Sequence, residues 1–275
     1  RPPIDQSTDD ARSLLFHTAP LSEDVEILGN PVLRLRVSAD RPVAKLAARL
    51  VEIGADGQSW LVTSGLLNLT HRDSHAAPEP LVPGAPYDVE LRLSSAAHRF
   101  NAGGRIGLAI SESLWPLVWP SPEIATLTLS LGALSLPVRP HEAKPAPFPI
   151  PERHTPSRDG APRPTAVTEP VLPGLYRIEL STPLAAGPPN VTGARLGRGR
   201  LEVSELREGD PNSGVWRHRA TSSWMRGDWD CAVEAACELR STADEFQLSE
   251  SLTAKRGDTV VFETRSESKT KRDLV

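Results

Sequence analysis

The glycine-rich stretch NAGGRIGLAIS, residues 101–111, is the first place in this sequence where ligand chemistry would be sought. Crowded glycines at the entry to a helix expose backbone amides that hold a phosphate group. However, Gly103-Gly104-x-x-Gly107 lacks the G-x-G-x-x-G spacing of dinucleotide-binding folds. The apolar residues of IGLAI, 106–110, then alternate as in a strand, and a strand offers no helix dipole to an anion. We therefore interpret the stretch as a tight turn that leads into a strand.

A second candidate is the segment HRDSH, which brings three potential metal ligands together at His71, Asp73 and His75. Two imidazoles and a carboxylate are a suitable ligand set for zinc. The segment runs directly into AAPEP, which is typical of an exposed loop. A solvated loop is the favoured interpretation, so we expect neither a metal site nor a cofactor.

Motifs for nucleophilic and hydrolytic catalysis are missing from the sequence. It contains no Gly-x-Ser-x-Gly, no His-Glu-x-x-His and no Walker loop. Scattered Ser, His and Asp residues could still assemble a triad, but no spacing indicates one. Arg-Gly-Asp occurs at 226–228 and 256–258, where Gly-Asp is ordinary turn chemistry between strands rather than an adhesion motif. We expect no catalytic residue in this chain.

Two tryptophans, Trp115 and Trp119, flank Pro116 and Pro120 in the run LWPLVWPSP. On a rigid loop they could stack on sugars or anchor another protein surface, because tryptophan is enriched at binding hot spots. They could equally fold back and cap a hydrophobic core. We retain both interpretations, and we name Trp115 and Trp119 as the candidate domain interface.

The elements that must position these residues are predicted to be strands. Apolar and polar residues alternate in short runs, and turn residues separate the runs at fairly regular intervals, which favours an all-β sandwich over a parallel sheet with helices. The predicted strands are 33–37, 44–53, 60–62, 66–69, 87–93, 106–110, 125–131 and 134–138.

A proline-rich stretch separates this set from a second β region. Eleven prolines lie between Pro137 and Gly174, which predicts an extended connection. Beyond it, 176–180 and 229–239 alternate, and residues 246–264 predict a hairpin around Arg256-Gly257-Asp258. Cys231 and Cys237 fall on one face of a strand, roughly 20 Å apart at ~3.3 Å per residue, too far for a disulfide. We expect two buried free thiols in a reducing compartment.

Composition excludes several classes of partner. The chain has 275 residues, with 31 Lys+Arg against 35 Asp+Glu and a net charge of −4. This balance predicts no nucleic-acid partner, and the apolar runs are too short to predict a membrane span. The sequence starts at Arg1 and its single methionine is Met225, so we expect a piece of a longer, cytoplasmic protein.

Several segments together resemble the C-terminal domain of the Xaa-Pro dipeptidyl-peptidase/cocaine esterase (CocE/NonD) hydrolase family. The resemblance is most specific at HRFNAGGRI, where the family has F-x-x-G-H-R-I and Gly104 replaces the usual histidine. It covers residues 14–138, and the end from Gly227 onward is similar to a C-terminal extension of some members. The other segments that carry it are TAPLSEDVEILG (18–29), KLAARLVE (45–52) and TSGLLNL (63–69).

The resemblance implies a jelly-roll, or galactose-binding-like, β-sandwich over residues 1–140. A Pro-rich connection (141–174) and a smaller antiparallel β extension (175–275) follow. It also implies a non-catalytic role. The jelly-roll supports an N-terminal α/β-hydrolase domain and a cap domain of the same protein, with possible roles at the active-site entrance or in homo-oligomer contacts. The triad of a dipeptidyl-peptidase, esterase or acylase would belong to that N-terminal part. The alternatives are a carbohydrate-binding module and a self-contained enzyme.

Overall fold

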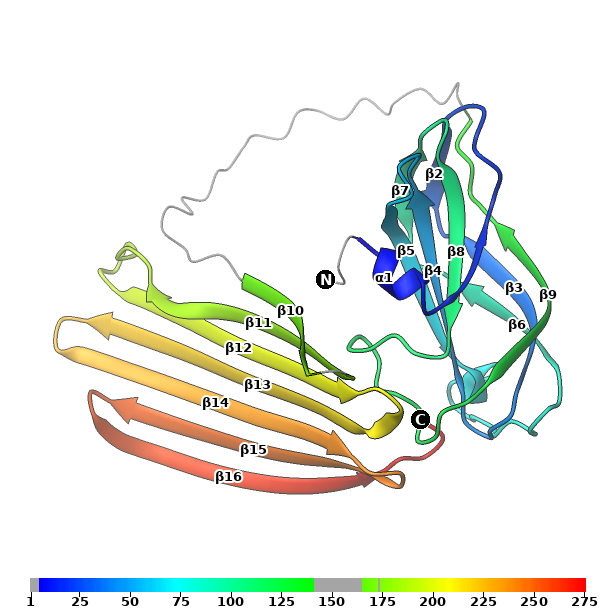
Figure 1. Ribbon diagram of the computed structural model, residues 1–275. Helices are drawn as coiled ribbons and strands as arrows, with labels where there is room; N and C mark the ends of the chain where they lie inside the picture. Colours follow the sequence, from blue (N-terminus) through cyan, green and yellow to red (C-terminus); the bar gives the residue numbers. More distant parts are fainter. Residues whose placement is uncertain (1–4, 141–164, 173) are drawn as a thin grey trace. The chain divides into compact units, whose positions relative to one another are not determined.

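The protein is almost entirely β in the computed structural model, which describes residues 5–140, 165–172 and 174–275. This confirms the predicted fold class. The chain divides into two compact units, one comprising residues 1–149 with 274–275 and the other residues 150–273. Much of the predicted connection, residues 141–164, lies outside the described residues. Its last part, Thr165–Leu172, forms strand β10 (Figure 1). Within the described ranges, no helix is both long and apolar enough to span a membrane.

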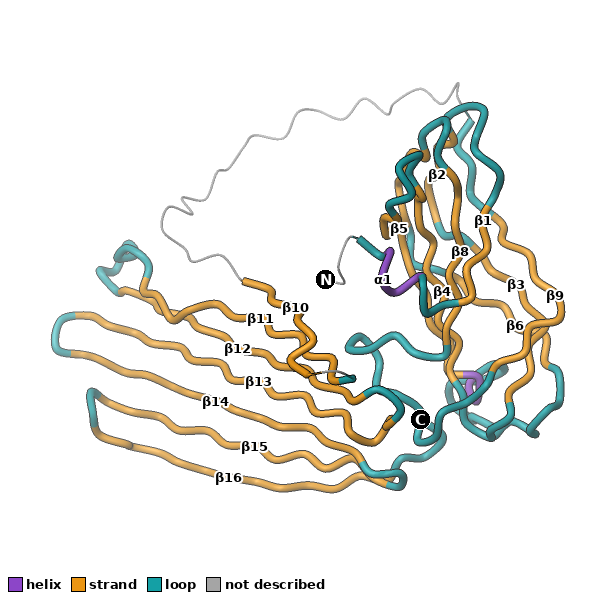
Figure 2. Tube along the Cα trace, viewed as in Figure 1, coloured by secondary structure: helices purple, strands orange, loops and turns teal. Residues whose placement is uncertain are grey.

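The first unit is a sandwich of antiparallel sheets. One sheet has the strand order β1-β8-β4-β5, and it faces strands from a β6-β3-β9 sheet and a β2-β7 pair. Figure 2 shows how little helix accompanies them. The elements are α1 (Ser7–Asp10), β1 (Leu14–His17), β2 (Val25–Gly29), β3 (Val32–Ala39), β4 (Lys45–Ile53), β5 (Ser59–Asn68), the 3₁₀ helix η1 (Leu69–His71), β6 (Tyr87–Arg92), β7 (Ala96–Phe100), β8 (Arg105–Ser111) and β9 (Leu127–Ser135).

The core lies between these sheets and follows the predicted alternation. Leu33, Leu35 and Val37 of β3 point into it, and Ile106, Leu108 and Ile110 of β8 meet them from the other sheet. Burying such side chains contributes about 1.5–3 kcal/mol each. In two places, two predicted strands correspond to one strand of the structure. The predicted strands 60–62 and 66–69 both overlap β5, and the predicted strands 125–131 and 134–138 both overlap β9.

Strand β4 is buried on both faces, because an N-terminal segment (residues 5–13) covers the face opposite the core. On the core side lie Leu46, Ala48 and Leu50, whereas Arg49 points to the covered side and is 5% exposed. One Arg49 NH2 lies 3.0 Å from Asp10 Oδ1, and its NH1 donates to Gln6 Oε1 at 2.6 Å. These contacts fasten the segment onto the sheet.

The second unit is one antiparallel sheet in which every strand pairs with its neighbour in sequence (Figure 1). The two Arg-Gly-Asp sequences form two of its tight turns, with φ of +61° at Gly227 and +53° at Gly257, as predicted from turn chemistry. The strands after β10 are β11 (Leu175–Ala186), β12 (Arg195–Arg207), β13 (Asp210–Arg226), β14 (Trp229–Ser241), β15 (Glu245–Arg256) and β16 (Thr259–Lys271).

The two faces of this sheet differ in polarity. The pairing register puts Trp216, Leu239 and Leu248 on one face, and Arg217 and Glu238 on the other. The prediction of buried thiols was wrong, since Cys231 and Cys237 are both half-buried. Each lies on a single-layer sheet, where no second sheet in the described part of this unit covers it.

Candidate domain interface

The tryptophan loop (residues 112–126) joins β8 to β9 and carries both predicted interface residues. Trp115 and Trp119 pack edge to face, with ring centroids 5.2 Å apart and planes at 80°. Val118 N donates to Leu114 O at 3.1 Å, which closes a turn between them, and the Trp115–Pro116 peptide is cis. The two indoles therefore form one compact cluster.

Neither indole belongs to the sandwich core. Both side chains are half-buried, and neither is among the buried residues that make up the core cluster. The Trp115 Nε1 atom is shielded from water, yet no acceptor for its hydrogen lies among the described residues. A buried donor without a partner costs about 1–3 kcal/mol. The prediction that the pair caps the core is not what the structure shows.

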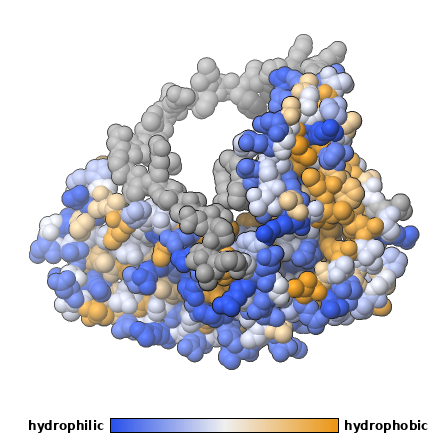
Figure 3. Space-filling model, viewed as in Figure 1, coloured by the Kyte–Doolittle hydropathy of each residue, from blue (hydrophilic) through white to orange (hydrophobic). Residues whose placement is uncertain are grey.

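Exposed apolar side chains accompany the tryptophans. Within the loop, Leu117 is 55% and Ile124 53% exposed. Leu14 of β1 is 52% exposed and is the strand partner of Ile110 in β8. Ile110 lies two residues before the loop begins. Figure 3 shows apolar side chains gathered on the visible face of the sandwich. Exposed apolar side chains such as those of this loop are of the kind found at interaction sites.

The glycine-rich stretch forms a hydrogen-bonded turn anchored on Glu52. Glu52 Oε1 accepts from the backbone N–H (2.9 Å) and side-chain amide (3.0 Å) of Asn101, and Oε2 lies 2.9 Å from His98 Nε2. Burial opposes ionisation of this carboxyl, but the hydrogen bonds from Asn101 and His98 outweigh it and lower the pKa of Glu52. Gly103 adopts φ +81°, which favours glycine. The turn prediction is confirmed, and the Glu52 anchor was missed because it lies 46 residues from His98.

The HRDSH segment begins in η1 and continues as a loop. His71 and His75 approach each other, with their Nδ1 atoms 3.3 Å apart, but Asp73 points to Arg72, whose Nε lies 3.3 Å from Asp73 Oδ2. Among the described residues no group of three His, Cys, Asp or Glu side chains is placed to hold a metal ion. The segment does not bring its three candidate ligands together.

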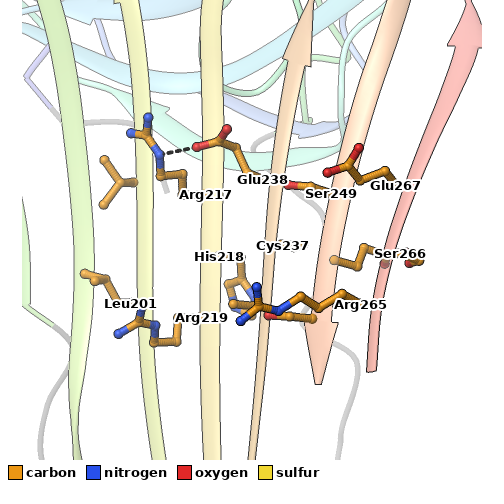
Figure 4. A pocket seen from close by; sticks show the side chains of 14 residues that line it. Leu201, Arg217, His218, Arg219, Cys237, Glu238, Ser249, Arg265, Ser266 and Glu267 are labelled. Atoms are coloured by element: carbon orange, nitrogen blue, oxygen red, sulfur yellow. Dashed lines mark hydrogen bonds and ion pairs between the residues drawn. The ribbon is translucent and has the colours of Figure 1, made fainter. Parts of the chain in front are cut away.

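The sheet of the second unit has a depression, seen in Figure 4, that is lined by charged side chains of both signs. Arg217 and Glu238 point toward one another across β13 and β14, with Nε 2.5 Å from Oε2. His218, Cys237 and Glu250 lie in one row across neighbouring strands. Burial, together with the Glu250 charge, raises the pKa of the Cys237 thiol. A raised pKa disfavours the thiolate, so the row contains no activated nucleophile.

Comparison with protein families places more than half of the chain in one of them. Residues 4–161 match the model described as the X-Pro dipeptidyl-peptidase C-terminal non-catalytic domain. A putative Xaa-Pro dipeptidyl-peptidase of Rhodopirellula baltica is 33% identical over 133 residues, which are 46% of this chain and 21% of that protein. A cocaine esterase of Rhodococcus sp. is 28% identical over 103 residues, 38% of this chain and 18% of that protein.

A solved structure of an α-amino acid ester hydrolase is also similar, with 25% identity and a TM-score of 0.47. The similarity covers 50% of this chain and 27% of that one. The chain therefore spans about a fifth of the length of the curated relatives that it matches. The family model and the curated relatives confirm the resemblance that the sequence motifs indicated.

Proposed function

Because this chain belongs to the family of X-Pro dipeptidyl-peptidase C-terminal non-catalytic domains, we propose that it is the C-terminal, non-catalytic portion of a CocE/NonD-type serine hydrolase. Its role is to support the α/β-hydrolase domain of that enzyme. The tryptophan loop makes the contact and borders the active-site entrance. Both cysteines are free thiols, which supports a cytoplasmic location.

The observation that carries this proposal is the pair of exposed apolar side chains, Leu117 and Ile124, on the loop that holds the two half-buried indoles. A docked domain would cover Leu117 and Ile124, which are 55% and 53% exposed here. Docking would then bury apolar area, which contributes roughly 25 cal/mol per Å².

The test adds this chain to a separately produced α/β-hydrolase and cap portion of a relative in the same family. Binding is measured by isothermal titration calorimetry. Trp115→Phe replaces the indole by a smaller ring and reduces the cluster, so it weakens binding, whereas Trp119→Ala removes a whole indole and weakens it more. Trp229→Ala, on a 45%-exposed tryptophan of β14 in the second unit, is the matched control. Equal affinities for all four proteins contradict the proposed contact.

The carbohydrate-binding alternative remains testable on the same residues. A sugar ring stacks on an open aromatic face, but in the tryptophan loop the edge of one indole covers the face of the other. Glycan-array binding that Trp119→Ala abolishes would favour that alternative. Hydrolysis of a p-nitrophenyl ester by this chain, lost on substitution of one serine, would favour a self-contained enzyme.

A further inference from the structure

Strand β16 forms one edge of the second unit's sheet, and its order of charges matches an antiparallel copy of itself. We propose that two copies of this chain associate by pairing β16 with β16 across a two-fold axis at Ser266. The partner is thus a second copy of the chain, and the surface is the 13-residue strand Thr259–Lys271. This inference is independent of the proposed contact by the tryptophan loop.

The first ground is that the strand is long and open. It pairs only with β15 among the described strands, and all of its residues are exposed (Figure 1). One row of its backbone N–H and C=O groups therefore faces outward, and such a row is a template for another strand. Natural proteins often protect such edges with charged side chains that repel other strands. The charges on β16 therefore determine which strand can pair with it.

The second ground is the order of charges on one face. Glu263, Arg265, Glu267 and Lys269 alternate along the strand, and the β15 register puts all four on the charged face that carries Arg217 and Glu238. Like charges on an edge repel other strands. Here negative and positive residues are interleaved, so attraction or repulsion depends on the register of the incoming strand.

The third ground is that one register satisfies all four charges. In an antiparallel two-fold pair centred on Ser266, Arg265 lies opposite Glu267 of the second copy, and Glu263 lies opposite Lys269. Two-fold symmetry repeats each pair, as an isologous interface requires. Opposite charges directly across two strands stabilise a pair, whereas like charges destabilise it.

The neighbouring registers are less favourable. Centring the pair on Arg265 puts arginine against arginine and Glu263 against Glu267. Centring it on Glu267 puts glutamate against glutamate and Arg265 against Lys269. Centring it on Thr264 keeps only the Glu263–Arg265 pair and puts Val261 against Glu267. Registers centred between two residues are excluded, since they would set outward-facing backbone groups against inward-facing ones.

The other face of the strand agrees with the same register. Ser266 meets its own copy, and Thr264 meets Ser268, so small hydroxyl side chains that can hydrogen bond lie across the seam. The register irregularity of β16 lies near Val260, outside the charged segment, which leaves residues 262–271 regular for pairing. The charges at Arg265 and Lys269 are 79% and 67% exposed, so they can turn toward a second copy.

Sedimentation equilibrium on the 275-residue chain tests the proposal over roughly 1–100 μM, the range in which a modest interface is populated. The wild type is expected to be a concentration-dependent dimer. Arg265→Glu creates two glutamate–glutamate contacts by symmetry and raises the dimer dissociation constant by about tenfold or more. Arg265→Glu combined with Glu267→Arg exchanges the charges, restores both pairs and returns the dissociation constant to near the wild-type value.

A control and a register probe complete the design. Lys255→Glu makes the same charge reversal on β15, away from the edge, and should leave the dimer unchanged. In a Cys231→Ser/Cys237→Ser background, Ser266→Cys should give a disulfide-linked dimer under mild oxidation. Ser268→Cys should not, because its two copies would lie roughly 13 Å apart.

The proposal is overturned by a monomer at every concentration, by a dimer that Arg265→Glu does not weaken, or by a charge exchange that fails to restore association. Open-ended oligomers would also overturn it, since they indicate head-to-tail pairing of β16 with another edge. Trp119→Ala leaves the dimer intact, so failure here and failure of the domain contact are separate results.

Discussion

The ion pair between Asp10 and Arg49 should govern the stability of the first unit, and Asp10→Asn tests this. Both side chains are nearly buried, at 5% exposed for Asp10 and 6% for Arg49. Removing one partner leaves the other charge buried and uncompensated, which costs 3–5 kcal/mol in comparable cases. Because Gln6 and Ser13 still accept hydrogen bonds from Arg49, we expect the lower end, about 3 kcal/mol.

Differential scanning calorimetry of the chain measures this loss. At roughly 2–4 °C per kcal/mol for a unit of this size, the melting transition of the first unit should fall by about 6–12 °C. The transition of the second unit should not move. Asp88→Asn is the matched control, because Asp88 pairs with Arg36 at the surface and is 75% exposed. Exposed pairs contribute less than about 1 kcal/mol.

A double variant separates the charge from the packing. Replacing the pair by apolar residues, in Asp10→Leu with Arg49→Met, removes both charges and should recover most of the lost stability. The reasoning is refuted if Asp10→Asn costs no more than the Asp88 control. In that case the N-terminal segment would not be fastened by this pair.

Three further results are expected. The pKa of Glu52 is lowered in the folded protein, so the ionised carboxylate stabilises the fold at pH values above the ordinary glutamate pKa near 4.5. This stabilisation is lost as the pH falls through the folded pKa. In urea titrations, the stability difference between wild type and Glu52→Gln should therefore shrink below about pH 4.5. Gly107→Ala should destabilise the first unit by about 1–3 kcal/mol, since a Cβ there would lie 2.6 Å from Val51 Cγ2; thermal unfolding checks it, and Gly57→Ala, with a φ of +84° but open space around it, separates backbone strain from crowding. Arg217→Met should cost less than about 1 kcal/mol, because Arg217 is 41% exposed, and the cost should fall further in 1 M salt; an unchanged cost at high salt would contradict an electrostatic origin.

Alternation of apolar and polar residues predicted most of the strands that line the two-layer core, although β2 and β7, which add Ile27 and Phe100, were not predicted. Strands β3, β6 and β8 each have one buried face, so their patterns are regular. Strands β12 and β13 were not predicted. They belong to a single-layer sheet, where neither face must be uniformly apolar, and β12 includes the run GRGR. Period-two patterning weakens where a sheet lacks a second layer.

The candidate interface was predictable in residue type but not in geometry. Prolines around Trp115 and Trp119 indicate a rigid loop, yet their edge-to-face packing depends on how the chain turns between them. The anchors of the first unit are long-range in the same way. Glu52 meets His98, and Asp10 meets Arg49, across separations that no local pattern encodes. A paired charge is visible in sequence only when its partner is a near neighbour.

These anchors also occupy two carboxylates of the first unit, Glu52 and Asp10, in hydrogen bonds and ion pairs within the fold. A general base needs a lone pair free to take a proton from substrate, and its pKa should lie near the working pH. Glu52 uses three hydrogen bonds to hold a turn, and they lower its pKa, away from the range of a base at neutral pH. Asp10 is occupied in the same way, between Arg49 and Ser59. Both carboxylates therefore serve to hold the fold of the first unit together.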